Sequence, residues 1–150
     1  NYQIMKKIFI LFLFISACGY QPLYNINEDK FLFRELQLSG DKEINRKIIS
    51  SLEIKESQTK DSNTIFFIES SKKITETSKD SRGQPATYRT NVIIKLVIKD
   101  LDKIIKTKVF EEDFSYDNRD NKYDLLSYQN DIENNLVNKI IEDIILFINL

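Results

Sequence analysis

The strongest constraint on the fold is a change in hydrophobic period between the middle of the chain and its end. In residues 88–99 apolar and polar side chains alternate, which is the pattern of a β-strand with one buried face. From about Asp124 the apolar residues instead recur at every fourth position, as at Ile132, Leu136 and Ile140, which predicts a long amphipathic helix. A chain that contains both patterns is expected to pack a helix against a sheet.

The remaining segments predict three more strands and one more helix. Strands are expected over residues 31–39, 64–77 and 104–116, and the last of these is expected to bulge near 111–113. An apolar stripe predicts a helix over residues 42–53, with Asp41 as its N-cap. The predicted order is β-α-β-β-β-α. We therefore predict an α+β two-layer sandwich, in which a four-stranded mixed β-sheet carries two α-helices on one face.

The N-terminal segment has the features of a signal peptide. Met5, the only methionine, is the expected start, and Lys6 and Lys7 follow it as a positive pair. The next ten residues, 8–17, are mostly apolar. At 1.5 Å per residue they cover about half of a bilayer core of ~30 Å, which is the length of a signal sequence and too short for a stable spanning helix.

The string Ile15-Ser16-Ala17-Cys18 resembles the bacterial lipobox, in which an aliphatic residue and two small residues precede a cysteine. It predicts that Cys18 becomes the mature N-terminus and carries a covalent diacylglycerol and an acyl chain. The alternatives are a secretory signal followed by an incidental free thiol and a short buried segment. The expected organisation is a lipoprotein signal peptide (1–17), a lipidated tether (18–30) and one periplasm-facing domain (31–150).

Composition excludes several kinds of chemistry. The chain contains no histidine, one cysteine and three glycines, so it cannot form a catalytic triad with histidine, a histidine zinc site, an internal disulfide or a glycine-rich phosphate loop. Its 22 Lys and Arg residues are balanced by 23 Asp and Glu residues, which argues against a nucleic-acid partner. We expect no enzyme activity, no metal site and no cofactor apart from the covalent lipid.

The charges are unevenly distributed along the chain. Residues 72–108 carry 10 basic and 4 acidic side chains, whereas residues 109–150 carry 3 basic and 10 acidic ones. This cationic hairpin, with Lys106 and Lys108 on its neighbouring strand, suits an amphiphile that has phosphates and acyl chains, or the wall of another protein. Exposed strand lysines are also common as edge protection. The candidate ligand residues are Arg82, Arg89, Lys95 and Lys99.

Four short motifs resemble those of the LPS-assembly lipoprotein LptE family, particularly its alphaproteobacterial branch. They are Ala17-Cys18-Gly19-Tyr20-Gln21-Pro22-Leu23-Tyr24, the Arg82-Gly83 loop that leads through Thr87 and Arg89 to residues 96–100, Phe114-Ser115-Tyr116-Asp117 with Tyr123 after it, and the Ile-Glu-Asp-Ile run at 141–144. The chain departs from the family at Asn130, Asn134 and Asn135, where alanine is common, and at Asp117, where asparagine is common.

The resemblance implies two helices on a four-stranded sheet and a role without catalysis. It implies an outer-membrane lipoprotein that plugs the large β-barrel LptD, helps to assemble it and assists insertion of lipopolysaccharide (LPS) into the outer leaflet. Its partners would be LptD, LPS and the outer membrane, which Cys18 would anchor from the periplasmic side. The alternatives are an accessory lipoprotein of a phospholipid-transport system and an envelope enzyme that uses carboxylates or serine.

Overall fold

The computed structural model of the protein describes residues 32–56 and 63–149. The elements in chain order are β1 (Leu32–Phe33), β2 (Glu35–Gly40), α2 (Lys42–Ser51), β3 (Lys55–Glu56), β4 (Thr64–Lys79), β5 (Pro85–Asp100), β6 (Lys103–Asp117) and α3 (Lys122–Asn149). The expected signal peptide and tether, including Cys18, lie outside the described residues.

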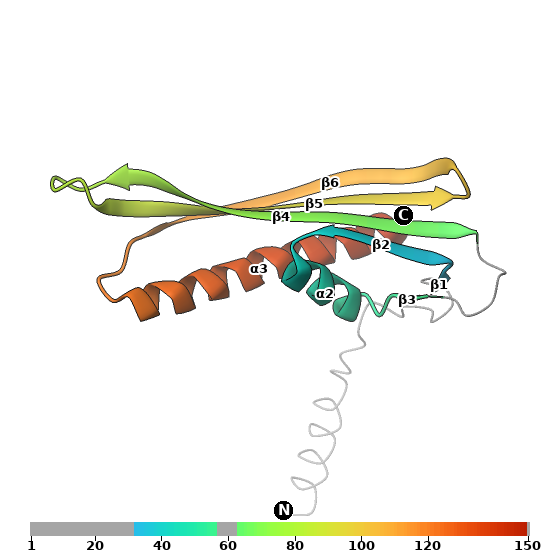
Figure 1. Ribbon diagram of the computed structural model, residues 1–150, viewed down its shortest axis with the longest axis horizontal. Coiled ribbons are helices and arrows are strands. Elements are labelled where there is room, and N and C mark those ends of the chain that lie inside the picture. Colours follow the sequence, from blue (N-terminus) through green and yellow to red (C-terminus); the bar gives the residue numbers. More distant parts are fainter. Residues whose placement is uncertain (1–31, 57–62, 150) are drawn as a thin grey trace, which may run out of the picture. The chain divides into compact units, whose positions relative to one another are not determined.

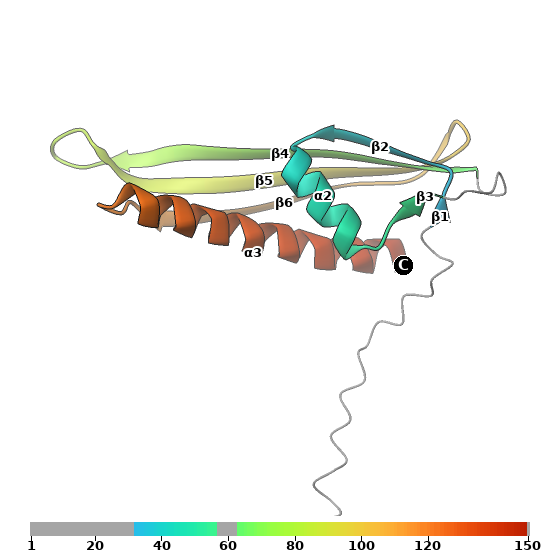
Figure 2. The ribbon, with the colours of Figure 1, turned by 60° about the horizontal axis from the view of Figure 1, so that its bottom comes forward.

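Four strands form one mixed sheet in the order β2-β4-β5-β6. β2 and β4 are parallel and are connected through α2, whereas β4, β5 and β6 follow one another as antiparallel neighbours. Both helices lie on the same face of this sheet, as Figures 1 and 2 show. The predicted α+β sandwich and its β-α-β-β-β-α order are therefore confirmed.

The first predicted strand is interrupted. It breaks at Arg34 into β1 and β2, and β1 pairs with β3 in a separate two-stranded parallel sheet that the sequence did not predict. Phe33 of β1 is buried, and its ring lies 4.6 Å from that of Phe66 on β4. The short sheet therefore extends the apolar core beyond the end of α2.

The bulge expected near residues 111–113 was predicted in the wrong place. The pairing of β5 with β6 is regular there, and its register shift lies between Ile98 and Lys99, opposite Ile104. Glu112 lies on the helix-covered face, where its carboxylate accepts a hydrogen bond from Lys139 of α3 at 2.7 Å. The acidic run is thus accommodated by a partner on the helix rather than by a bulge.

The core lies between the helices and one face of the sheet. On β5 the even-numbered residues Val92, Ile94 and Leu96 have no exposed surface. α3 covers them with Ile132, Leu136, Val137, Ile140, Ile141 and Ile144. α2 contributes Ile44 and Ile48 next to Phe66 and Ile68 of β4. The odd-numbered residues of β5 point to the opposite side, here called the open face because neither helix covers it (Figure 1).

A small polar network is enclosed where β2 turns into α2. The Asn45 amide donates to the Ser39 carbonyl at 2.8 Å, and the Ser70 hydroxyl donates to the Asn45 side-chain oxygen at 2.7 Å. Asp41 caps the helix by accepting hydrogen bonds from the backbone N–H groups of Glu43 and Ile44. These bonds satisfy the polar groups buried beneath α2 and fix the helix on the sheet.

Lys72 and Lys47 link α3 to β4 and α2. Lys72 of β4 forms a 2.6 Å ion pair with Glu133. The hydrogen bond to Glu133 raises the pKa of Lys72 above its ordinary value, although partial burial opposes this effect. Lys47 of α2 donates to the backbone and side-chain oxygens of Asn134.

Candidate functional site at the end of the hairpin

Arg82 lies in the turn between β4 and β5 and is largely exposed. Its guanidinium group is 3.2 Å from the Asp80 carboxylate, which also accepts hydrogen bonds from the backbone N–H groups of Arg82 and Gln84, each at 2.8 Å. The bond from Gln84 is the largest cause that lowers the pKa of Asp80, and the bonds from Arg82 add to it. The turn therefore presents one cation beside a carboxylate that stays ionised.

Arg89 lies on the open face of β5 and is held by side chains of β6. Its Nε atom donates to the Ser115 hydroxyl at 3.0 Å and is 3.4 Å from the Asp113 carboxylate. Half of the Arg89 side chain remains exposed. The single Nε–H of Arg89 is thus already engaged within the protein.

Lys95 and Lys99 lie on the same open face. Lys95 stands opposite Glu69 of β4 and Val109 of β6, whereas Lys99 stands opposite Ile65 and Ile104. The ten residue steps from Arg89 to Lys99 correspond to ~33 Å along a strand. The four predicted cations therefore do not form one site, because three are spread along the open face and Arg82 lies in the turn beyond its end.

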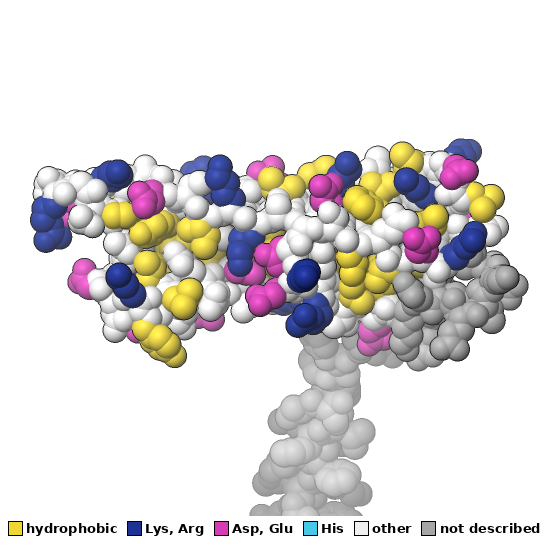
Figure 3. Space-filling model, viewed as in Figure 1, with side chains coloured by type: hydrophobic (Ala, Val, Ile, Leu, Met, Phe, Trp, Pro, Cys, Tyr) yellow, Lys and Arg dark blue, Asp and Glu magenta, His cyan; other side chains and the backbone are white. Residues whose placement is uncertain are grey.

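Arg82 instead shares a pocket with Arg119 and Lys122, which are not among the predicted ligand residues. The pocket has a volume of about 560 Å³ and lies between the β4–β5 turn and the start of α3. We call it the terminal pocket, and it is lined by Asp80, Arg82, Gln84, Pro85, Ala86, Tyr88, Asn118, Arg119, Asp120, Lys122 and Leu125. Figure 3 shows dark blue Lys and Arg side chains both at the end of this hairpin and at the beginning of α3.

The segment between β6 and α3 brings Arg119 and Lys122 into the terminal pocket. Asn118 fixes this segment, because its amide donates to the Pro85 carbonyl and its side-chain oxygen accepts from the backbone N–H of Arg119. The Arg119 guanidinium carbon lies 3.9 Å from the centre of the Tyr128 ring, a cation–π distance. The Asn-Arg-Asp-Asn-Lys string was the available signal, but only the fold places it beside Arg82.

The terminal pocket can bind an anionic group. Arg82, Arg119 and Lys122 provide three cations, and two arginines can hold a phosphate in a bidentate manner. Asp80 and Asp120 offset part of that charge, so affinity for a single phosphate should be modest and sensitive to salt.

The described residues contain neither a cluster of metal ligands nor a helix that could cross a membrane. Among residues 32–56 and 63–149, no group of three or more Cys, Asp or Glu side chains is arranged to hold a metal ion. In the same part of the chain, neither helix has the length and apolar character needed to cross a membrane.

The fold is that of several solved bacterial lipoproteins. The rare lipoprotein B from Shewanella oneidensis aligns with a TM-score of 0.59 at 13% identity, over 77% of this chain and 93% of that one. Uncharacterized lipoprotein B from Nitrosomonas europaea aligns with a TM-score of 0.56 at 10% identity, over 83% and 88%. A minor lipoprotein from Acinetobacter baumannii aligns with a TM-score of 0.50 at 9% identity, over 76% and 89%. No protein-family model and no curated protein matches the sequence.

Proposed function

We propose that this chain is an outer-membrane lipoprotein of the LptE type, which plugs an LptD-like β-barrel, helps to assemble it and assists LPS insertion. The observation that carries the proposal is the coincidence of two independent features. One is the Cys18 lipobox with the Gly-Tyr-Gln-Pro-Leu-Tyr string after it, and the other is the fold shared with the lipoprotein from Shewanella oneidensis. In this role the protein has no catalytic residues.

The dimensions of the domain suit a wide barrel. Four strands spaced ~4.8 Å apart and a helix layer ~10 Å thick give a cross-section of roughly 20 Å in each direction. The sixteen residues of β4 and of β5 each correspond to ~50 Å of strand. Such a body fits a barrel of 22 or more strands, the class that holds plugs, with the strands of the plug running along the barrel.

The anchor gives the first test. Changing Cys18→Ser should leave the protein unprocessed or release it from the outer membrane, since the acyl chains supply its main membrane affinity. The measurement is fractionation of cell envelopes, with Ser16→Ala as a control that keeps a small residue before the cysteine. Retention of the Cys18→Ser variant in outer membranes that lack the barrel would contradict lipid anchoring.

For LPS contact, the terminal pocket is a better candidate than the open face. An amphiphile with several phosphates needs several cations around one site, and Arg82, Arg119 and Lys122 line one pocket. Arg89 lies on the open face outside this pocket, and its Nε is engaged by Ser115 and Asp113. Lys95 and Lys99 remain as a charge-matched comparison on the same domain.

A pair of double variants tests this assignment. Changing Arg82→Glu with Arg119→Glu should weaken LPS binding by about tenfold or more, whereas Lys95→Glu with Lys99→Glu should change it by less than about threefold. The measurement is binding of the purified full-length protein in detergent to LPS over a salt series. Equal losses would indicate general charge attraction, and a loss confined to the lysine pair would move the site to the open face.

Co-purification distinguishes the proposed role from its alternatives. Capture of the tagged protein from native envelopes should recover one large β-barrel. Recovery of a phospholipid-transport assembly would favour the accessory-lipoprotein reading, and turnover of a cell-wall or lipid substrate would favour an enzyme.

A further inference from the structure

Among the described strands, none pairs with the outer edge of β6. β6 is the last strand of the sheet. Asn118, which directly follows β6, donates its backbone N–H to the Ala86 carbonyl of β5 at 2.8 Å. β5 and β6 keep this register from the pair Thr87–Asp117 to the pair Ile98–Lys106. Because backbone groups alternate in direction along a strand, the even-numbered residues of β6 bond to β5 and the odd-numbered ones face outward.

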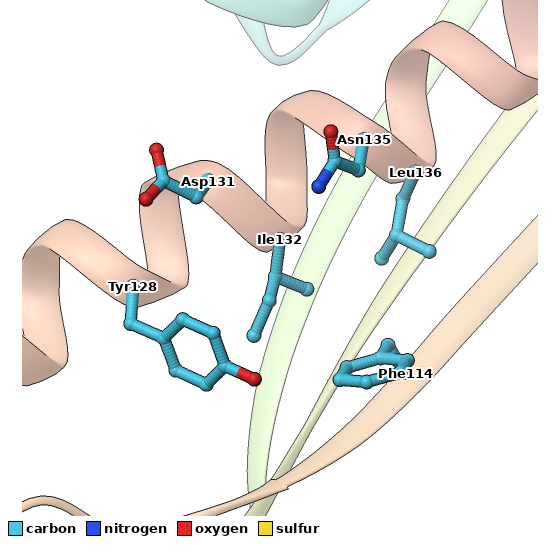
Figure 4. A pocket seen from close by; sticks show the side chains of 6 residues that line it. All are labelled: Phe114, Tyr128, Asp131, Ile132, Asn135 and Leu136. Carbon is cyan, nitrogen blue, oxygen red and sulfur yellow. The ribbon is translucent and has the colours of Figure 1, made fainter.

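An apolar pocket lies directly beside this edge. It has a volume of about 220 Å³ between β6 and α3, and we call it the edge pocket; its lining residues are Phe114, Tyr128, Asp131, Ile132, Asn135 and Leu136. Figure 4 shows the rings of Phe114 and Tyr128 and the side chains of Ile132 and Leu136 directed toward one another. Phe114 remains 47% exposed although it lies on the helix-covered face. The pocket is therefore large enough for one apolar side chain and open at the strand edge.

The surroundings of the edge are acidic. Residues 109–150 carry 10 acidic and 3 basic side chains, and Asp131 stands at the rim of the edge pocket. Glu111 and Asp113 lie on the open face of the same strand, where they contact Asn91 and Arg89 respectively. Two cations near the edge are already engaged, because Lys139 is paired with Glu112 at 2.7 Å and the Arg119 guanidinium lies 3.9 Å from the centre of the Tyr128 ring. A segment that approaches this edge is favoured when it is basic.

We propose that the outer edge of β6 between Glu111 and Asp117 binds an extended, basic polypeptide segment by strand addition, with one apolar side chain of that segment in the edge pocket. The outward N–H and C=O groups of Glu111, Asp113 and Ser115 supply main-chain hydrogen bonds, and the edge pocket supplies selectivity for the one side chain that enters it. A groove between a strand edge and a helix suits this mode of recognition. Its occupation requires neither LPS nor a barrel.

A synthetic peptide tests the site in the full-length protein in detergent. The probe is acetyl-Lys-Val-Lys-Phe-Lys-Val-Lys-amide with a fluorophore, and the measurement is fluorescence anisotropy. Binding should weaken by about tenfold when the central Phe of the peptide is Ala, and by a similar factor in the Asn135→Trp protein, whose indole would fill the edge pocket. The matched control is Asn130→Trp, the same change at an exposed position of α3 outside the pocket, and it should bind as wild type.

N-methylation of the peptide tests the strand-addition geometry. In an antiparallel complex the Lys residues would direct their N–H groups to β6, and in a parallel complex the Val and Phe residues would do so. Methylation of one set alone should therefore abolish binding, while methylation of the other set should have little effect. Equal effects of both sets, unchanged binding to Asn135→Trp, or self-association of the protein in place of peptide binding would each overturn the proposal.

Discussion

Replacing Ile140 by Asp should lower the free energy of unfolding by about 3–5 kcal/mol. Ile140 has no exposed surface and lies in the middle of the row of α3 that packs on the sheet. The substitution removes a buried apolar side chain and places a carboxylate in the apolar layer between α3 and the sheet. The carboxylate must then either be protonated or force α3 away from β5 and β6, and both outcomes are costly.

The matched control for this prediction is Asn138→Asp, because it introduces the same side chain at an exposed position two residues earlier. Its effect should stay within about 0.5 kcal/mol. Urea unfolding of both variants, followed by far-UV circular dichroism, gives the comparison. If Ile140→Asp unfolds at the same urea concentration as Asn138→Asp, α3 does not rest on the sheet through this face.

The order of elements could be predicted because each element carries its own periodic signal. The alternation in residues 88–99 and the four-residue step after Asp124 are local properties of the chain, and the folded domain keeps both. The same alternation correctly put Arg89, Lys95 and Lys99 on one face of β5. The hydrophobic period does not determine the register between strands. The grouping of the predicted cations into one site depends on that register.

One extra residue at the bulge decides which face of the sheet the following side chains of β6 point to. Lys99 stands opposite Ile104, but Ile98 stands opposite Lys106, so β6 has one extra residue between these pairs. Without that residue, Lys106 and Lys108 would share the open face with Lys95, as their place in the sequence indicated. The one-residue shift instead turns them to the helix side. There Lys106 donates to the last carbonyls of α3, and Lys108 lies over the Phe110 ring.

The terminal pocket could not be predicted from the sequence, because its residues come from segments that are far apart in the chain. Arg82 and Arg119 are far apart in the chain, and they meet because the β4–β5 hairpin extends to the level at which α3 begins. β4 and β5 pair as far as Lys79 and Pro85, and this pairing sets the length of the hairpin. The predicted strands 64–77 and 88–99 were shorter and stopped before these residues. Aromatic support from Tyr128 likewise depends on the start of α3.

Replacing Gly40 by Ala should destabilise the domain by about 3 kcal/mol or more. Gly40 ends β2 with φ of +87°, a conformation that L-residues rarely adopt. A Cβ atom there would lie 1.8 Å from the Ser70 carbonyl oxygen of β4, a backbone atom that cannot rotate away. β2 would have to separate from β4 at this point. The Asp41 N–H bond to Ser70 and the Ser70–Asn45 bond beneath α2 would then be lost together.

Gly83→Ala separates this clash from the cost of the backbone conformation. Gly83 has a similar φ of +78°, but an added Cβ would meet no atom within 4 Å. That variant therefore carries only the conformational cost of about 1–2 kcal/mol. Thermal unfolding of the two variants should show a clearly larger loss for Gly40→Ala, because its effect includes the separation of two paired strands. Equal losses would mean that the close approach of β2 to Ser70 contributes nothing to stability, and that α2 is held in place by its apolar stripe alone.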